Sequence, residues 1–234
     1  MTRAAPFVSC LCVTRARVPL LRRAVACFQR QGHAQRELVV VYDADDVPTR
    51  RYLEELGDDR VRAVEAPASP RMKLGSLRNL AVESARGAFI AQWDDDDWHA
   101  PDRLSRQLDA LGEGGKPACV LWQWTLFDSS SGQAYLSTGR PWEGSLVAER
   151  AGMPAYPDFA RFEDTPLVAS LAQAGNLVAL QHRPDLYIYV HHGANTWGRV
   201  HWKREVLRGA TPLPADESRR VAAVLAAIPE TRPA

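Results

Sequence analysis

The sequence has few features that would cross-link, anchor or strongly charge the chain. It contains only four cysteines and no CxxC pair, so neither a disulfide framework nor a cysteine zinc site is predicted. No segment approaches the roughly 20 apolar residues that span a membrane, and the first apolar run, about seven residues long, is too short for a secretory signal. With 29 basic and 28 acidic side chains, no nucleic-acid groove is expected.

What remains is the composition of a globular protein with a substantial core. Hydrophobic residues make up 46% of the chain and charged residues 24%, which are ordinary values for a folded domain. Cys10 and Cys12 lie two residues apart in a strand-like segment, so both should point to the same face. We interpret the cysteines as reduced core thiols, which is typical of a cytoplasmic protein.

In the first half of the chain, short apolar runs alternate with segments of helical period. Strands are predicted at 7–13, 37–43, 61–66 and 88–93, and helices at 20–30 and 76–85, the second ended by Gly87. This alternation predicts an α/β fold, with a Rossmann-like, mostly parallel sheet covered by helices on both faces. In such sheets, ligands bind beyond the carboxyl ends of the strands.

The second half has a more mixed pattern. After a helix at 102–111, the strand-like segments ACVLWQWTLFD, QAYLS and SLVAER are separated by turn residues and indicate hairpins rather than βαβ units. A helix at 166–174, strands in NLVAL and YIYVHH, and an amphipathic helix near the carboxyl terminus complete the prediction.

An acidic run, Asp94 to Asp97, directly follows the fourth predicted strand. Adjacent carboxylates resist ionisation unless a cation offsets them. A calcium EF-hand loop is excluded, because the sixth position counted from Asp94 is His99, where glycine is needed. Mg²⁺ or Mn²⁺ instead uses one or two carboxylates together with substrate phosphates. Asp94 and Asp96 have the spacing to supply that pair, and a solvated acidic turn is the alternative.

Two later segments carry further candidates. Glu163 and Asp164 precede a helix predicted from about Pro166, where a carboxylate can cap the helix or serve as a general base. His191 and His192 are adjacent in an extended run, so only one of them can enter a given site. A lone histidine is more often structural than a ligand, and the chain has no HExxH or Cys/His zinc spacing.

Together these segments resemble the family 2 inverting glycosyltransferases of the GT-A fold. The resemblance spans about residues 6–202 and follows the family's order of motifs: VSCLCVTRAR, ELVVVYDADD, LGSLRNLAVESARGAFIAQWDDDDWHAPDRL, RFEDTPLV and YVHHGANTW. It implies a nucleotide-sugar-binding half at 1–113, an acceptor-side half of the same GT-A domain at 114–202, and a C-terminal tail with one amphipathic helix at 203–234.

By this resemblance, five residues would bind the donor. Thr14 and Asp43 would line the nucleotide pocket, with Asp43 facing the base, and Arg78 would meet the nucleotide. Asp94 matches the first acid of the DxD motif, near the ribose and sugar. Asp95 is an additional acid of the same run.

The resemblance also assigns the metal and the chemistry. Asp96, the second acid of the DxD motif, would hold Mn²⁺ or Mg²⁺ at the diphosphate, and His192 matches a late histidine that touches the metal or diphosphate in some GT-A enzymes. Asp164 matches the catalytic base of the ED motif, and Glu163 would contact the acceptor or orient the base.

The implied reaction is metal-dependent hexosyl transfer to a hydroxyl group by single displacement. The donor would be a nucleotide-diphosphate sugar, with UDP favoured and GDP as the alternative, and the acceptor a glycan or another hydroxyl compound. Two other hypotheses are kept: a non-catalytic nucleotide- or glycan-binding module of the same fold, and a sugar-phosphate nucleotidyltransferase. The latter should carry a Gly-rich phosphate loop where this chain has VTRARVPLL.

Overall fold

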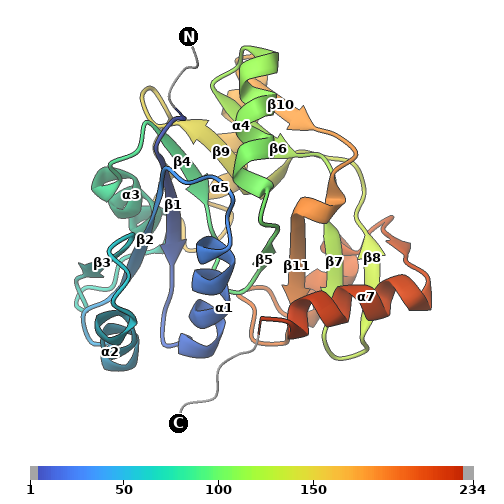
Figure 1. The fold of residues 1–234 in the computed structure, drawn as a ribbon, viewed down its shortest axis with the longest axis horizontal. Helices are drawn as coiled ribbons and strands as arrows, with labels where there is room; N and C mark the ends of the chain where they lie inside the picture. The colour runs from blue at the N-terminus through green and yellow to red at the C-terminus, as the bar shows by residue number, and fades with distance from the viewer. Residues whose placement is uncertain (1–4, 229–234) are drawn as a thin grey trace.

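Two β-sheets carry the fold in the computed structural model, which describes residues 5–228 (Figure 1). The larger sheet has the strand order β10 (Leu177–Leu180), β6 (Ala118–Leu121), β9 (Trp142–Glu149), β4 (Phe89–Gln92), β1 (Val8–Val13), β2 (Arg36–Asp43) and β3 (Val61–Ala66). The smaller sheet has the order β12 (Thr211–Pro212), β8 (Gln133–Leu136), β7 (Thr125–Asp128), β11 (Tyr187–His191) and β5 (Trp98–His99).

The larger sheet confirms the predicted α/β fold and adds one antiparallel strand. β1, β2, β3 and β4 run parallel, with β1 between β2 and β4. β9 is antiparallel to both β4 and β6, and β10 is parallel to β6. Because β1, β2 and β4 are parallel neighbours, their carboxyl ends share one edge of the sheet. The sequences that follow Val13 and Gln92, and the last residue of β2, Asp43, therefore meet there.

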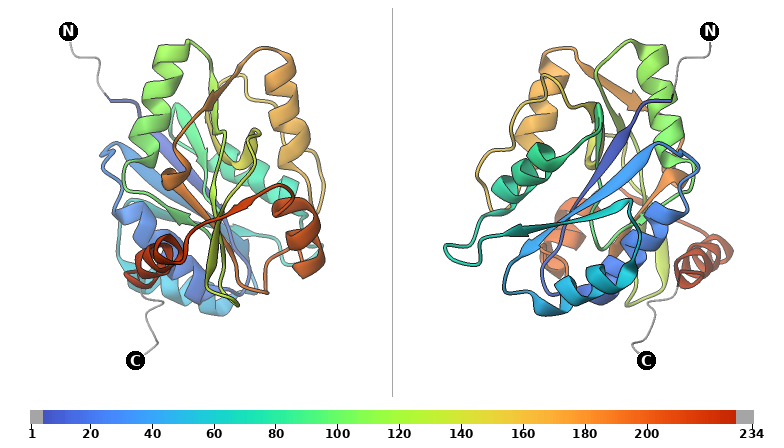
Figure 2. Two further views of the ribbon diagram at one scale, coloured as in Figure 1. Left: turned by 90° about the vertical axis from the view of Figure 1, so that its right-hand side faces the viewer. Right: turned by 60° about the vertical axis from the view of Figure 1, so that its left-hand side comes forward.

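Helices cover both faces of this sheet, as Figure 2 shows for α1 and α2 on one side and α3 on the other. The helices are α1 (Val18–Gln29), α2 (Val47–Leu56), α3 (Leu74–Ser84), α4 (Arg103–Gly114), α5 (Asp164–Gln173), α6 (Arg199–His201) and α7 (Ala215–Ala226), with a 3₁₀ turn η1 (Pro184–Leu186) and a π-helical turn η2 (Trp202–Val206). α2 was not predicted from the sequence, since it contains few apolar residues. The side chain of Asp46 accepts a hydrogen bond from Thr49 N and caps this helix.

Gly87 has a different role from the predicted one. α3 ends at Ser84, and its C-cap residue Ala85 is extended rather than left-handed, so Gly87 does not terminate the helix. A Cβ at Gly87 would instead lie 2.7 Å from each of three backbone atoms, on Phe7, Phe89 and Ser9. Glycine is required here because the chain enters β4 in close contact with β1.

Each face of the larger sheet has its own apolar core. Cys10 and Cys12 lie in the same cluster, on the side of α1 and α4, as their spacing predicts, while Leu11 faces the side of α3 and α5. All four cysteines are buried and free, and burial raises the pKa of the Cys27 thiol to about 11. These thiols therefore act as core residues. None of the helices between residues 5 and 228 is long and apolar enough to cross a bilayer.

The smaller sheet is packed through aromatic rings. Trp124 stacks on Trp142 and on Tyr187, with ring centroids 4.7 and 4.3 Å apart, and Trp202 is fully buried beside them. α7 packs on the outer side of β7 and β8 (Figure 1). Trp124 and Trp142 thus form part of the core rather than an exposed sugar-stacking surface.

Candidate active site

The four aspartates of the acidic run begin two residues after the end of β4, and two of them are buried. Asp95 is buried and accepts a hydrogen bond from Thr14 Oγ1 at 2.6 Å. Its other oxygen, Oδ1, lies 2.8 Å from Arg17 Nη2. Burial, together with the charge of Asp96, raises the pKa of Asp95 to about 7, although Arg17 and Thr14 oppose this shift. Asp95 and Thr14 are therefore bonded to each other below the surface of the site.

Asp97 links the acidic run to the smaller sheet. Its carboxylate accepts hydrogen bonds from Tyr187 Oη at 2.5 Å and from the backbone N–H of Val190 at 3.0 Å, both on β11. Burial raises the pKa of this carboxyl well above its ordinary value, and the charges of Asp96 and Asp94 raise it further. Through Asp97, the loop that ends β4 is fixed to the strand that precedes His192.

We expect Asp97→Ala to lower the free energy of unfolding by about 2 to 4 kcal/mol, because two buried donors, on Tyr187 and Val190, lose their acceptor. Asp97→Asn keeps an acceptor oxygen without a buried charge and should stay within about 1 kcal/mol of the wild type. Urea denaturation of both variants measures the difference. Equal stability of the alanine variant and the wild type would rule out this anchoring role.

Asp94 and Asp96 are the two partly exposed acids of the run, with side chains 25% and 14% accessible to solvent. Asp96 Oδ2 lies 3.2 Å from Arg17 Nη1, 3.3 Å from His192 Nε2 and 3.5 Å from Asn195 Nδ2. Burial opposes ionisation of Asp96, but the contacts from His192 and Arg17 outweigh it and lower the pKa of the carboxyl. Asp96 is thus an ionised carboxylate that solvent can reach.

Asp96 and His192 have a geometry that suits one divalent cation. Two ligands at right angles, each about 2.1 Å from a single cation, lie about 3 Å apart, close to the 3.3 Å between Asp96 Oδ2 and His192 Nε2. Across residues 5–228, no group of three or more His, Cys, Asp or Glu side chains could hold a metal. A cation held by Asp96 and His192 would need further ligands, which substrate phosphates supply in many Mg²⁺ sites.

Arg78 joins the acidic run to the start of α5. Its Nη2 lies 2.9 Å from Asp94 Oδ1, and its Nε donates to Glu163 Oε1 at 2.7 Å. Burial disfavours the charge of Arg78, but Asp94 and Glu163 offset this and raise the pKa of the guanidinium well above its ordinary value. Arg78 was predicted to meet a nucleotide; it bonds here to two carboxylates, and a contact with a nucleotide stays a prediction.

Asp164 is the first residue of α5 and lies near the same network. Among the described residues, no side chain caps the start of this helix, so Asp164 is not held there as a cap. Gln92 Nε2 lies 3.5 Å from Asp164 Oδ2 and 3.4 Å from Asp94 Oδ2, and therefore faces both carboxylates. Burial raises the pKa of Asp164; Arg78 opposes the shift, and the charges of Glu163 and Asp94 add to it.

Asp43, at the end of β2, has two arginine partners of its own. Its buried carboxylate accepts a hydrogen bond from Arg15 Nε at 2.5 Å and from Arg71 Nη1 at 2.9 Å. The contact between Asp43 and a nucleotide base stays a prediction, and it would be made beside two guanidinium groups. Arg15, Arg17 and Arg71 were not predicted as site residues, although Arg15 and Arg17 belong to the basic segment TRAR that directly follows β1.

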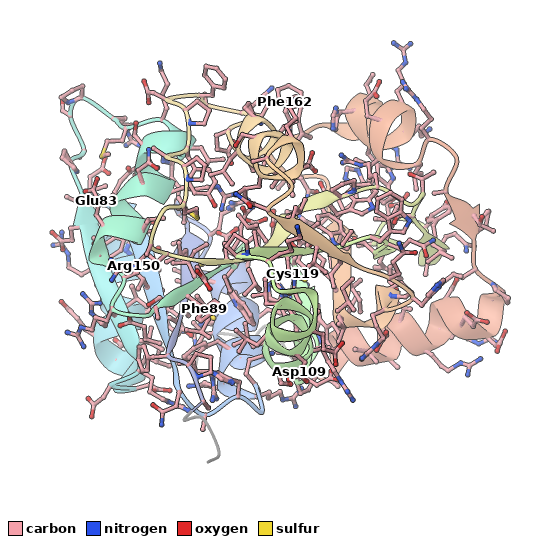
Figure 3. All side chains as sticks on the ribbon, turned by 90° about the horizontal axis from the view of Figure 1, so that it is seen from above. Glu83, Phe89, Asp109, Cys119, Arg150 and Phe162 are labelled. Carbon is pink, nitrogen blue, oxygen red and sulfur yellow. The ribbon has the colours of Figure 1, made fainter. Side chains whose placement is uncertain are left out.

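An aromatic cluster lies next to Glu163 and Asp164 in the chain. The ring of Phe162 is 4.3 Å from that of Trp197, and Trp197 stacks on His201 at the same centroid distance. Arg161 lies over the Trp197 ring at 4.9 Å. Phe162 is 52% exposed and has a positive φ of 61°, which is rare for a bulky residue. In Figure 3 it lies at the start of α5, on the other side of the view from Asp109 on α4.

The structure thus brings the predicted site residues into two connected groups, with Asp43 apart from both. Thr14, Asp95, Asp96 and His192 form the first group around Arg17; Arg78, Asp94, Glu163 and Asp164 form the second around Gln92; and Asp43 stands with Arg15 and Arg71. The acidic run connects the first two groups, since Asp94 belongs to one and Asp96 to the other.

Comparison with known proteins identifies the family and the fold. The profile of the family described as "Glycosyl transferase family 2" matches residues 9–157. Among curated proteins, the chain is 29% identical over 110 residues to the putative glycosyltransferase EpsH of Bacillus subtilis, and 33% identical over 100 residues to the succinoglycan biosynthesis protein ExoO of Rhizobium meliloti. These matches cover 46% and 42% of this chain but only 31% and 28% of the relatives.

Solved structures share the fold. A mannosyltransferase from Pyrobaculum calidifontis, in complex with GDP-Man and Mn²⁺, has a TM-score of 0.63 at 18% identity, over 85% of this chain and 60% of its own. TarS of S. aureus in complex with UDP-GlcNAc has a TM-score of 0.64 at 13% identity, over 95% of this chain and 66% of its own. The chain belongs to glycosyltransferase family 2, and its fold is GT-A.

Proposed function

We propose that this chain catalyses the metal-dependent transfer of a sugar from a nucleotide diphosphate to an acceptor hydroxyl, with inversion at the anomeric carbon. The observation that carries the proposal is the side chain of Gln92, which faces Asp94 at 3.4 Å and Asp164 at 3.5 Å. One amide thus joins an acid of the DxD motif to the candidate base of the ED motif. A donor sugar and an acceptor could meet between these two carboxylates.

On the donor side, Asp96 and His192 would hold Mn²⁺ or Mg²⁺, for which their geometry is suitable. When bound, the cation offsets the negative charge that grows on the leaving diphosphate. Asp94, held by Arg78, would orient the sugar and ribose. The nucleotide would lie along the carboxyl ends of β1 and β2, with Thr14 and Asp43 at its border. UDP is the favoured nucleotide of the donor, and GDP is the alternative. The neighbours that bind UDP-GlcNAc and GDP-Man support this range of donors.

On the acceptor side, Asp164 would remove the proton of the attacking hydroxyl. Its raised pKa suits this role, because a carboxylate of higher pKa is the stronger base. Glu163, held by Arg78, would contact the acceptor or orient the base. Attack from the face opposite the leaving diphosphate inverts the anomeric carbon in a single displacement.

The acceptor is proposed to be a glycan or another hydroxyl compound. The exposed ring of Phe162, one residue before Glu163, and the half-buried ring of Trp197, in the loop after β11, offer apolar faces on which a sugar ring could stack. The reduced, buried thiols fit a cytoplasmic location, which forms part of the proposal. The same holds for the division into a donor half at 1–113, an acceptor half at 114–202 and a tail from 203 to 234.

The proposal can be tested by measuring melting temperature and nucleoside diphosphate release with a panel of UDP-, GDP-, dTDP- and CDP-sugars, in Mn²⁺ and in EDTA. One donor should raise the melting temperature only with Mn²⁺, because ligand at 100 times its Kd stabilises the native state by about 2.7 kcal/mol, and should release its nucleoside diphosphate when an acceptor hydroxyl or water takes the sugar. Binding without turnover would identify a non-catalytic module. Formation of a nucleotide sugar and pyrophosphate from a nucleoside triphosphate and a sugar phosphate would identify a nucleotidyltransferase.

A further inference from the structure

Arg17 lies across the two central aspartates of the acidic run. It precedes α1 directly, and its two terminal nitrogens contact different carboxylates: Nη2 lies 2.8 Å from Asp95 Oδ1, and Nη1 lies 3.2 Å from Asp96 Oδ2. The Arg17 side chain is partly exposed, so a ligand can reach it. The guanidinium therefore lies next to the oxygen to which we assign the metal.

The two contacts of Arg17 differ in how firmly they are fixed. Asp95 is buried, and Thr14 holds its second oxygen at 2.6 Å. Asp96 is more exposed, and His192 and Asn195 approach the same oxygen as Arg17 does. The contact with Asp95 is thus anchored from behind, whereas the contact with Asp96 faces the open site and can be exchanged.

A divalent cation and the Arg17 guanidinium cannot share Asp96 Oδ2 without mutual repulsion, since like charges a few ångströms apart disfavour each other. A cation at Asp96 would therefore displace Nη1 of Arg17, while Nη2 keeps its contact with Asp95. The displaced nitrogen would then lie beside a metal-bound diphosphate, and a guanidinium matches the spacing of phosphate oxygens.

The other arginines at this edge have different partners. Arg15 and Arg71 bond to Asp43. Arg23 donates to the backbone carbonyl oxygen of Asp96 at 2.6 Å, so it supports the loop rather than the carboxylate. Arg17 is therefore the arginine placed to exchange between the metal-binding carboxylate and a phosphate.

We propose that Arg17 is a diphosphate-binding residue, which neutralises Asp96 in the nucleotide-free protein and moves onto the diphosphate of the donor when a divalent cation occupies Asp96. The inference rests on the proposed function and extends it. It makes Thr14 and Asp95 positioning residues that act through Arg17. It also couples the two ligands: the metal alone must compete with Arg17, while a diphosphate removes that competitor, so each ligand strengthens the binding of the other.

The test is isothermal titration of the wild type, Arg17→Ala and Arg17→Lys with three probes: Mn²⁺ alone, UDP or GDP in saturating Mn²⁺, and inorganic pyrophosphate in saturating Mg²⁺. In Arg17→Ala, Mn²⁺ alone should bind severalfold more tightly than in the wild type. With the divalent cation in excess, the nucleotides and pyrophosphate should bind at least about tenfold more weakly, because a hydrogen bond to a charged group is lost. The affinities of Arg17→Lys should fall between those of the wild type and Arg17→Ala, since lysine keeps the charge but lacks the planar guanidinium.

Arg220→Ala is the matched control, because it removes an arginine that pairs with Asp216 on α7, away from the acidic run. It should bind all probes as the wild type does. If Arg17→Ala binds pyrophosphate and nucleotide as tightly as the wild type, or binds Mn²⁺ more weakly, the inference is overturned while the proposed function stands. If the wild type binds neither UDP nor GDP even with Mn²⁺, the proposed function fails, and the inference fails with it. The lysine variant retains a cation at this position, which covers the case in which alanine prevents folding.

Discussion

Asp164→Asn is expected to lower kcat by about 10² to 10⁴-fold, the usual contribution of a general base. Asparagine keeps the shape of the side chain but cannot take the proton of the acceptor hydroxyl. Affinity for the donor nucleotide should stay near that of the wild type, since the substitution acts on the reaction rather than on binding. Steady-state kinetics with the donor found in the panel, together with titration of its nucleoside diphosphate, separates the two effects.

The raised pKa of Asp164 adds a signature in pH. In the wild type, activity should rise with pH as Asp164 loses its proton, and this acid limb should lie above the ordinary pKa of 3.8. For stability the sign is opposite. A group with a raised folded-state pKa stabilises the protein at low pH and loses that contribution as pH rises from 3.8 through the folded pKa. At neutral pH, the free energy of unfolding of Asp164→Asn should therefore be no more than about 1 kcal/mol below that of the wild type, which is the size of one helix-dipole contact.

Glu163→Gln is the paired variant for this test. Glu163 is buried and bonded to Arg78, so the substitution removes the charge of one partner of a buried ion pair and should cost stability. An Asp164→Asn variant with full transfer activity would exclude Asp164 as the base and would direct attention to Glu163. A stability loss in Asp164→Asn with an unchanged rate would indicate a structural role instead.

Asp96→Ala should abolish the Mn²⁺-dependent part of the stabilisation that a nucleoside diphosphate gives. At 100 times its Kd, a ligand stabilises the native state by about 2.7 kcal/mol, which for a protein of this length is a rise in melting temperature of about 5 to 10 °C. The variant should lose that rise in Mn²⁺ yet fold normally, because Asp96 follows β4 rather than packing within it. Thermal melts with and without Mn²⁺ measure the loss.

Asp109→Ala provides the control, since Asp109 is an exposed acid on α4, far from Phe162 in Figure 3. It should keep the full metal-dependent shift. If Asp96→Ala binds nucleotide and Mn²⁺ as before, the acidic run does not hold the metal, and if it unfolds, Asp96 is needed for the fold.

The periodic parts of the fold could be predicted from the sequence, but the order of the strands could not. The runs that became β1, β2 and β4 are nearly continuous in apolar residues, which is typical of buried parallel strands. The insertion of β9 between β4 and β6 depends on pairing between Phe89 and Glu149, 60 positions apart, and no local pattern records it. The strands β5 and β12 are two residues long, too short to show any period.

The site was predictable where residues carry their chemistry in adjacent positions, and not where partners come from distant strands. The acidic run and the Glu163–Asp164 pair stand out in the sequence. The sequence does not reveal that Asp97 faces β11 or that Gln92 faces both Asp94 and Asp164, since these contacts depend on where whole strands lie. Arg17 is an intermediate case: its charge is visible beside β1, but its partners are fixed by the parallel pairing of β1 with β4.

The position of β9 also affects how the chain can fold while it is being synthesised. β4 is complete once Gln92 has been made, but one of its two neighbours, β9, begins only at Trp142, and β6 lacks its partner β10 until Leu177. A nascent chain between these lengths has a strand with an unpaired edge, which is a template for aggregation, and such distant pairings form slowly. The aspartates that follow β4 are thus synthesised well before the sheet that positions them can close, so a truncated chain ending near residue 113 should depend on chaperones to stay soluble.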